Sequence, residues 1–408
     1  MKIKHVMVWL ALHVCFGLAF TGLLAIADGD DNTVTVANLN ILHGFACDPP
    51  APGDGDQCRV EDRIDLLMQH LEAVGCPDLV TLQENVTEAF VPLAPPVQVG
   101  PLTNTVELIT ARLPALAEAC TFPYQVVFDP EGATGPPAGQ GRGIDEELIL
   151  TRYPTVQAEV FPLYSPLAPF LFRHVLFARI DHPTGFVDVF TTHLAAEVDF
   201  GSLPCGVNVL QSPLMSPPCP AECVVSVDTV RECQAKQMAN FIEARHDVPN
   251  PALVTGDFNA EPFTNVYNEF AGPERGWRDS HLAAGNPECD PVTGVNCTAG
   301  REDTNASDLE SPALNQDRRI DYIFVVPASE GATCAGGIEP IAEDEADFDK
   351  SSTGLFAAVP NPFVDRCGSL PDAICWASDH SGNKATLVCE AKDDKSQSWE
   401  VALSPRGH

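Results

Sequence analysis

Residues 252–262 read Ala-Leu-Val-Thr-Gly-Asp-Phe-Asn-Ala-Glu-Pro, a short apolar run that reaches a glycine and is followed by polar side chains. A buried strand that ends in a glycine turn places the next polar residues at the edge of its sheet. Asp257 and Asn259 are two positions apart, so an extended chain would point both side chains to the same side. A carboxylate beside an amide suits a water molecule, a metal ion or a phosphoryl oxygen. Taken alone, these residues are equally typical of a plain turn after a core strand.

Length and composition predict a folded, strongly acidic protein. The chain has 408 residues, 45% hydrophobic and 20% charged, which is enough to bury a large core in one or two domains. Lysine and arginine total 23 against 57 aspartate and glutamate residues, which gives a formal net charge of −34. A surface this acidic argues against binding nucleic acid or an anionic membrane through a basic groove. A divalent cation that bridges an acidic site to a phosphate stays compatible with this charge.

The first 27 residues have the pattern of a signal peptide. Lys2 and Lys4 precede an apolar run, and Ala25-Ile26-Ala27 offers a small-residue cleavage site. The apolar run is long for a signal peptide, so an uncleaved anchor is the alternative. We expect a secreted protein, extracellular or periplasmic, that is cleaved near Ala27.

Cysteine content agrees with export. One of the 15 cysteines, Cys15, lies in the signal segment, and the remaining even number suits up to seven disulfides. Four cysteines lie close together in the sequence and could instead bind a metal: Cys205, Cys219, Cys223 and Cys233. The secretory start disfavours this metal-cluster alternative.

Apolar periodicity predicts an alternating α/β order. Residues 33–40 alternate apolar and polar side chains, residues 60–74 have apolar side chains at helical spacing, and residues 78–84 have the composition of a buried strand. This strand–helix–strand order favours an α/β layered domain. Further helices are expected at 106–120, bent at Pro114, and at 229–245, and further strands at 124–128, 147–151, 174–180, 186–193, 319–325 and 385–389.

Several segments read as insertions or loops. Cys-rich insertions are expected at about 200–227 and 287–316, and a polar tail at 393–408. The apolar stretch from Phe161 to Phe172 predicts either a buried hairpin or an exposed patch for a membrane or a lipid substrate. Arg231 and Gln234, in the helix that precedes residues 252–262, are expected to be surface or packing residues.

Polar groups able to do chemistry follow six predicted strands or turns. Each has an ordinary structural interpretation when taken singly, such as a cap or a hydrogen-bonded core histidine. Asp321 lies in an otherwise apolar strand, where an unpaired carboxylate would be costly to bury. His380 is its natural partner, because a carboxylate fixes the tautomer of an imidazole and raises its basicity. The full set is Asn40, Glu84, His193, Asp257 with Asn259, Asp321, and Asp379 with His380.

The residue types in this set favour one chemistry. Asn40, Glu84 and Asp379 offer the hard oxygen ligands that Mg²⁺ prefers. The two histidines and the Asp257/Asn259 pair then supply a base and groups that stabilise charge on phosphorus. The sequence therefore predicts a metal-dependent hydrolase of phosphate esters.

The order of these stretches resembles the endonuclease/exonuclease/phosphatase superfamily, which includes deoxyribonucleases, abasic-site endonucleases, bacterial sphingomyelinases and inositol polyphosphate 5-phosphatases. The resemblance implies an α/β fold, a four-layer sandwich of two central mixed β-sheets flanked by helices, in a catalytic domain over residues 28–392. It is carried by Asn38-Leu39-Asn40, Leu82-Gln83-Glu84, Thr192-His193-Leu194, Gly256-Asp257-Phe258-Asn259, Arg319-Ile320-Asp321-Tyr322 and Ser378-Asp379-His380.

The resemblance also implies a role for each site residue. Glu84 would hold Mg²⁺, for which Mn²⁺ or Ca²⁺ is the alternative, with Asn40 and Asp379 near the metal. Asp321 would orient His380, which is favoured over Asp257 as the general base. The remaining residues would position water and a phosphoryl oxygen (Asp257, Asn259) and stabilise the transition state or assist the leaving group (His193).

Two departures from the family pattern limit which of the family's residue roles can be assigned to this sequence. Leu42 occupies the position of an aspartate in the abasic-site branch, so that branch is disfavoured. Asp145, Glu146 and Glu147 compete for one supporting role near the site, and the sequence does not choose among them.

The expected function is that of a secreted Mg²⁺-dependent phosphodiesterase acting on nucleic acid or on a phospholipid such as sphingomyelin, by in-line attack of water. One alternative is a phosphomonoesterase that acts on a small substrate such as an inositol phosphate. Another is a catalytically inactive binding protein on the same scaffold. The stretch from Phe161 to Phe172 favours lipid and would allow peripheral membrane contact, and no obligate protein partner is evident.

Overall fold

The structure is a computed structural model that describes residues 33–42, 58–86, 104–128, 146–166, 173–183, 185–197, 200–207, 217–224, 227–246, 250–300, 309, 316–326, 339–340 and 374–388. The predicted signal peptide and the predicted tail at 393–408 lie outside these residues. Among the helices in the described ranges, none combines the length and the apolar character needed to cross a bilayer.

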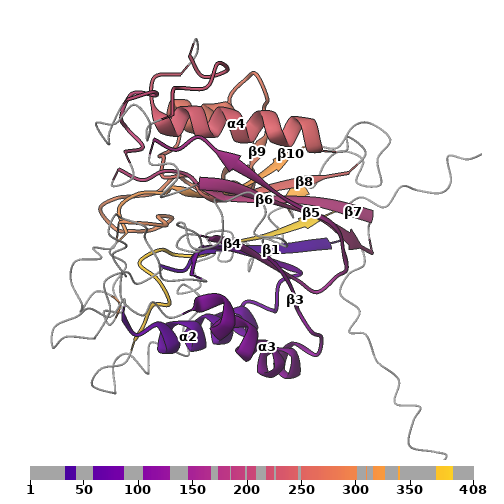
Figure 1. Cartoon of the computed structure of the whole chain (residues 1–408). Coiled ribbons are helices and arrows are strands. Elements are labelled where there is room, and N and C mark those ends of the chain that lie inside the picture. The colour runs from indigo at the N-terminus through magenta and orange to yellow at the C-terminus, as the bar shows by residue number, and fades with distance from the viewer. Residues whose placement is uncertain are drawn as a thin grey trace, which may run out of the picture. The chain divides into compact units, whose positions relative to one another are not determined.

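Two six-stranded sheets stack at the centre of the fold (Figure 1). The first sheet has the strand order β11-β12-β1-β2-β4-β3 and the second has the order β5-β6-β7-β8-β10-β9. The strands of the first sheet are β1 (Thr33–Asn40), β2 (Leu79–Asn85), β3 (Gln125–Val127), β4 (Glu146–Thr151), β11 (Glu339–Pro340) and β12 (Asn383–Val388). Those of the second sheet are β5 (Thr155–Leu163), β6 (Arg173–His182), β7 (Gly185–His193), β8 (Ala252–Asp257), β9 (Arg278–Asp279) and β10 (Asp321–Val326).

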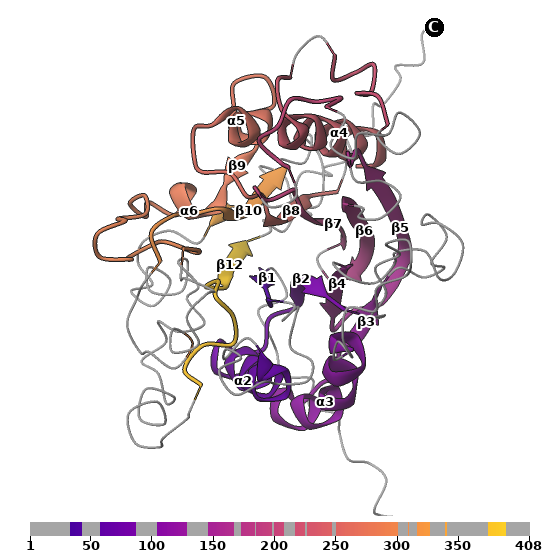
Figure 2. The same ribbon diagram turned by 60° about the vertical axis from the view of Figure 1, so that its left-hand side comes forward.

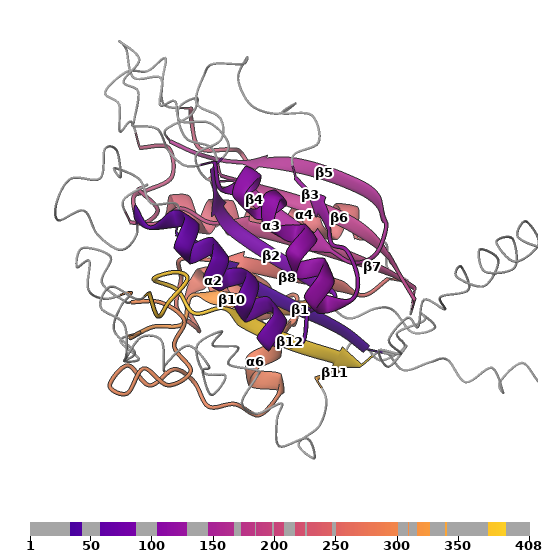
Figure 3. The same ribbon diagram turned by 90° about the horizontal axis from the view of Figure 1, so that it is seen from below.

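Helices cover the outer face of each sheet, as Figures 2 and 3 show. The first sheet carries α2 (Val60–Ala73) and α3 (Thr105–Cys120), which runs through Pro114. The second carries α4 (Val230–Arg245) and α5 (Asn265–Ala271), while α6 (Ser280–Ala283) is a short helix next to β9. This arrangement confirms the predicted four-layer α/β sandwich.

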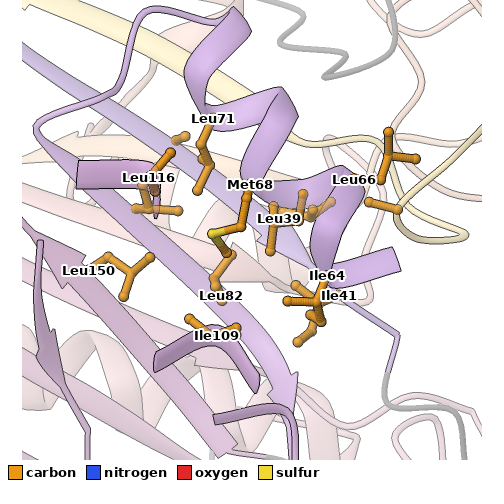
Figure 4. Packing of buried hydrophobic residues seen from close by; sticks show 14 of the residues in the cluster. Leu39, Ile41, Ile64, Leu66, Met68, Leu71, Leu82, Ile109, Leu116 and Leu150 are labelled. Atoms are coloured by element: carbon orange, nitrogen blue, oxygen red, sulfur yellow. The ribbon is translucent and has the colours of Figure 1, made fainter. Parts of the chain in front are cut away.

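Apolar side chains fill the space between the layers. Figure 4 shows Leu39, Leu82 and Leu150 of the first sheet meeting residues of α2 and α3 such as Met68 and Ile109. A second cluster joins the sheet of β5–β10 to α4 and α5, and a third lies between the two sheets. Each fully buried side chain of this size contributes about 1.5–3 kcal/mol to folding.

The topology brings the predicted site residues to one edge. Each sheet contains one parallel pair joined through a helix, β1-α2-β2 and β7-α4-β8, so the carboxyl ends of four strands lie on one side. Strands β10 and β12 run antiparallel to β8 and β1, and they start where their neighbours end. Asp321 consequently pairs with Asp257 across β10 and β8.

Four disulfides join described residues: Cys76–Cys120, Cys205–Cys219, Cys223–Cys233 and Cys289–Cys297. The first links the ends of α2 and α3. The next two pair the four cysteines for which a metal cluster was the alternative, so the disulfide interpretation holds for this group.

Two regions differ from the sequence expectation. Residues 265–283 contain α5, β9 and α6, and residues 155–163 form the edge strand β5, which includes Pro162. A proline and partly exposed positions on both faces are typical of an edge strand and hide its alternation. Phe161 stacks on Phe241 of α4 with ring centroids 4.5 Å apart, and Leu163 and Tyr164 are buried. In the described part of the Phe161–Phe172 stretch, Phe161 is partly buried, Pro162 is exposed and residues 163–166 are buried, while residues 167–172 lie outside the described residues.

His70 of α2 makes folding sensitive to acid. Its side chain is 2% exposed, and burial lowers the pKa of His70 from 6.5 to about 4. Between these values the folded protein binds fewer protons than the unfolded chain, so the contribution to stability is complete above pH 6.5 and falls as the pH drops toward 4. The loss should approach about 3 kcal/mol.

Urea unfolding at pH 7 and pH 4.5 measures this loss, with His70→Leu as the non-titrating variant. The wild type should lose more stability between the two pH values than the variant does. An equal fall in the two proteins would contradict the assignment to His70.

Candidate active site

A cavity of about 940 Å³ opens at the edge where the strand ends meet. Two predicted site residues lie directly behind its lining: Asn40 contacts Glu84 and Asp257, and Asp321 contacts His380. The structure therefore brings together every side chain in the predicted set. Those that line the cavity are Glu84, His193, Asp257, Asn259, Asp379 and His380.

Asp321 and His380 form a buried pair. Asp321 Oδ2 lies 2.9 Å from His380 Nδ1, and the opposite ring nitrogen, Nε2, lies 3.8 Å from Asp257 Oδ2. Burial raises the pKa of Asp321 to about 6 while the imidazole of His380 opposes this shift. Burial also disfavours the imidazolium of His380, but the carboxylates of Asp321, Asp379 and Asp257 outweigh it and raise the His380 pKa well above 6.5. The pair thus fixes the ring with one nitrogen available to a ligand in the cavity.

The Asp257–Asn259 turn is not extended. Asn259 has a φ of 48°, and its backbone N–H donates to Asp257 Oδ1 at 2.8 Å. The expectation that an extended chain aligns the two side chains is wrong, because the left-handed residue turns Asn259 toward His193. Asn259 Nδ2 lies 2.9 Å from His193 Nε2 and donates to the carbonyl of Leu194 at 2.9 Å.

His193 is held from both sides of the sandwich. Its backbone N–H donates to Glu147 Oε1 at 2.8 Å, and Nε2 lies 3.4 Å from Asp257 Oδ2. Glu147 is 1% exposed and also pairs with His174. Among the three acidic residues that competed for a supporting role, Glu147 contacts the site, whereas Asp145 lies outside the described residues.

Helix α4 fixes the segment after His193. Gln234 Oε1 accepts from the N–H of Ala195 at 2.8 Å, and Arg231 Nε donates to the Ala195 carbonyl at 2.6 Å. Gln234 is fully buried and its amide nitrogen donates to the Tyr164 carbonyl at 2.7 Å. These two residues therefore position the segment after His193. The expectation that they are surface or packing residues did not include this role.

Glu84 projects from an irregular strand end. Its φ is 63°, and the β2–β4 register shifts between Leu82 and Asn85. A non-glycine residue in this conformation is strained, and such strain persists only where the surroundings impose it. Asn40 Nδ2 donates to Glu84 Oε1 at 2.8 Å and to Asp257 Oδ2 at 3.1 Å. The amide nitrogen of Asn40 thus faces both carboxylates, while its oxygen accepts from the N–H of Leu42 at 3.0 Å.

Arg63 of α2 places a buried cation beneath the site, and sequence reasoning missed it. The side chain is 1% exposed, and Nη1 donates to the carbonyls of Ile41 at 2.5 Å and Ala377 at 3.3 Å. Burial lowers the pKa of Arg63 to about 10, whereas Asp379 and Glu84 act to raise it. Arg63 therefore ties the end of β1 to the segment that carries Asp379 and His380.

The donor set fits a divalent cation. Three of the carboxylates that line the cavity belong to the predicted site, Glu84, Asp257 and Asp379, and Asp321 lies behind them. The positive charge of Arg63 balances one of these, so negative charge remains in excess. Hard oxygen donors in excess of positive charge suit Mg²⁺ or a similar ion.

Fold and site together define an α/β sandwich of the phosphoesterase type. The Endonuclease/Exonuclease/phosphatase family model matches residues 37–380, and the chain belongs to this family. Members of the family hydrolyse phosphate esters and generally use divalent metal ions. No curated protein matches the sequence.

Several solved structures are similar to this chain at low sequence identity. An endonuclease/exonuclease/phosphatase from Bacteroides vulgatus is 19% identical, with 88% of this chain and 99% of that chain covered and a TM-score of 0.50. The Bacteroides thetaiotaomicron mannosyl-6-phosphatase is 18% identical, with coverages of 87% and 99% and a TM-score of 0.48. The human Nocturnin catalytic domain is 16% identical, with coverages of 87% and 94% and a TM-score of 0.45.

Proposed function

We propose that the protein is a secreted, divalent-metal-dependent phosphodiesterase in which His380 activates the attacking water. The observation that carries this proposal is the Asp321–His380 pair, whose free ring nitrogen faces Asp257 at the cavity. The nearby carboxylates keep the imidazole of His380 charged while no cation is bound. A cation held beside them would lower the pKa of His380, so that Nε2 could accept a proton from water while Asp321 holds the proton on Nδ1. The water attacks phosphorus and the alcohol opposite it departs.

The other side chains act by position and charge. Asp257 and Asn259 would orient the water and one phosphoryl oxygen, and His193 would stabilise the added charge or protonate the departing oxygen. Glu84 and Asp379 would hold the cation, with Asn40 fixing the Glu84 carboxylate. When bound, Mg²⁺ supplies Lewis-acid stabilisation of phosphoryl charge.

The cavity favours a polar leaving group over an acyl chain. Its described lining includes six carboxylate residues and three arginines but few large apolar side chains. A small phosphomonoester is the second candidate, because walls at residues 196–197, 201–202, 261–262 and 264–266 enclose space beside the reacting groups. Export is supported by the four disulfides among described residues.

Metal removal tests the proposal. EDTA should abolish hydrolysis of a substrate panel (plasmid DNA, RNA, sphingomyelin, phosphatidylcholine and phosphorylated inositols), and added Mg²⁺ should restore it. Calorimetric titration with Mn²⁺ gives a readout independent of turnover, and Glu84→Gln should bind the ion more weakly than the wild type. Full activity in chelator would contradict the metal assignment.

A further inference from the structure

One wall of the cavity is built by the segment that follows His193 together with the first turn of α4. Its lining residues fall within 196–197, 201–202 and 229–232, which we call the clasped wall. Two disulfides, Cys205–Cys219 and Cys223–Cys233, brace it. The N–H of Val230 donates to the Leu203 carbonyl at 2.9 Å, which ties the insertion to the start of α4. The wall is therefore held in place before any ligand binds.

Arg231 is the cation of the clasped wall. Its side chain is 13% exposed, Nε donates to the Ala195 carbonyl and Nη2 donates to Glu197 Oε1 at 3.0 Å. A Cβ atom at Gly201 would come within 2.7 Å of Nη2, so the backbone packs directly against the guanidinium. Within the described residues, Nη1 has no hydrogen-bond partner. A rigid donor is thus left for a ligand.

Helix stability does not explain Arg231. The residue lies in the first turn of α4, where the positive end of the helix dipole disfavours a cation. The N–H groups of this turn already have partners, because that of Glu232 donates to Thr229 in a capping box and those of Val230 and Arg231 donate to the carbonyls of Leu203 and Gly201. The position is accounted for by the contacts that Arg231 makes with Ala195 and Glu197 at the cavity.

The pairing with Glu197 indicates what the wall binds. A guanidinium beside a carboxylate offers a donor and an acceptor together, and adjacent hydroxyl groups can satisfy both because each hydroxyl donates and accepts. A polyanionic group would meet the carboxylates of Glu197, Glu232 and Glu261, which line the same cavity. An acyl chain would cover Arg231 without giving its free donor a partner.

We infer that the Arg231–Glu197 pair binds hydroxyl groups of the leaving alcohol, so that phosphate esters of polyhydroxylated alcohols are preferred substrates. This inference rests on the proposed hydrolysis of phosphate esters. It assigns a specificity-determining role to the disulfide-braced insertion.

A matched pair of substrates tests the inference: the methyl phosphodiesters of glucitol and of 1-hexanol, each assayed also as the phosphomonoester. The wild type should prefer the glucitol ester in kcat/KM by roughly tenfold, the value of a hydrogen bond to a charged group. Arg231→Met and Glu197→Gln should each remove most of this preference, chiefly by raising KM for the glucitol ester. Arg245→Met is the control, because it removes an Arg–Glu pair, to Glu159, at the other end of α4.

The outcomes separate the inference from the proposed function. An unchanged preference in both wall variants overturns the inference while hydrolysis stands. An equal loss for both esters in Arg231→Met also overturns it, because Arg231 would then act only through Ala195 on His193. If the wild type hydrolyses a member of the substrate panel but neither pair of esters, the inference is overturned. If it hydrolyses neither the panel nor these esters, the proposed function itself is contradicted.

Discussion

Replacing His380 with alanine should lower kcat by about three orders of magnitude, the contribution of a well-placed general base. The variant removes the ring nitrogen that faces Asp257 and leaves Asp321 buried without its partner. Asp257→Ala should cause a comparable loss, since both side chains act on the reacting groups. Asp321→Asn should cost less, because the imidazole remains and only its orientation and tautomer are weakened.

Steady-state kinetics with the best substrate of the panel, alongside thermal unfolding, checks this expectation. His246→Ala is the control, because His246 lies at the end of α4 beside Asp188 and not in the cavity. Wild-type turnover in His380→Ala would place the base elsewhere. A loss of kcat accompanied by unfolding at the assay temperature would be uninformative on its own, so Asp321→Asn supplies a milder change at the same pair.

The layers of this fold follow from local patterns in the sequence. Apolar periodicity defined β1, α2 and β2, and the parallel pairs place their carboxyl ends on one side of each sheet. Polar residues that interrupt apolar strands at those ends, such as Glu84 and Asp257, were therefore predictable as site residues. Short elements were not predictable, because the two residues of β9 and the seven of α5 are too few to show an apolar periodicity.

Supporting residues depend on information that is not local. Glu147 faces the space between the sheets, where it contacts His193, and the alternation of β4 alone does not tell which face of the strand is turned to that space. Arg63 did leave a signal, because it occupies a position in phase with the apolar side of α2, next to Ile64. A charged residue in such a position requires buried partners, and the carbonyls of Ile41 and Ala377 come from distant parts of the chain.

The turn at Asp257 shows the limit of strand geometry. Asp257 and Asn259 lie together as their spacing predicts, but the reason differs from the predicted one, since the left-handed φ of Asn259 turns the amide toward His193. The same limit applies to the adjacent Gly256. The sequence predicts that a turn there requires glycine, but it does not predict which residue of the neighbouring strand Gly256 contacts.

Gly256→Ala should destabilise the fold by about 2–4 kcal/mol, the combined cost of a left-handed alanine and of overpacking. Gly256 has a φ of 143°, and a Cβ there would overlap the carbonyl oxygen of Thr192 on the neighbouring strand β7. Thr192 and Gly256 are paired in the parallel ladder next to His193 and Asp257. Relief of the overlap must separate β7 from β8 at this point, so kcat should fall together with stability.

Gly276→Ala is the matched control, because Gly276 has a φ of 63° but a Cβ there would meet nothing within 4 Å. It should cost only the backbone strain, about 1–2 kcal/mol, and leave kcat unchanged. Urea unfolding of both variants measures the difference, and activity below each midpoint reports on the site. If Gly256→Ala is no more costly than Gly276→Ala, the close approach of β7 and β8 does not hold Asp257 in place, and the strained turn must be fixed by its hydrogen bonds alone.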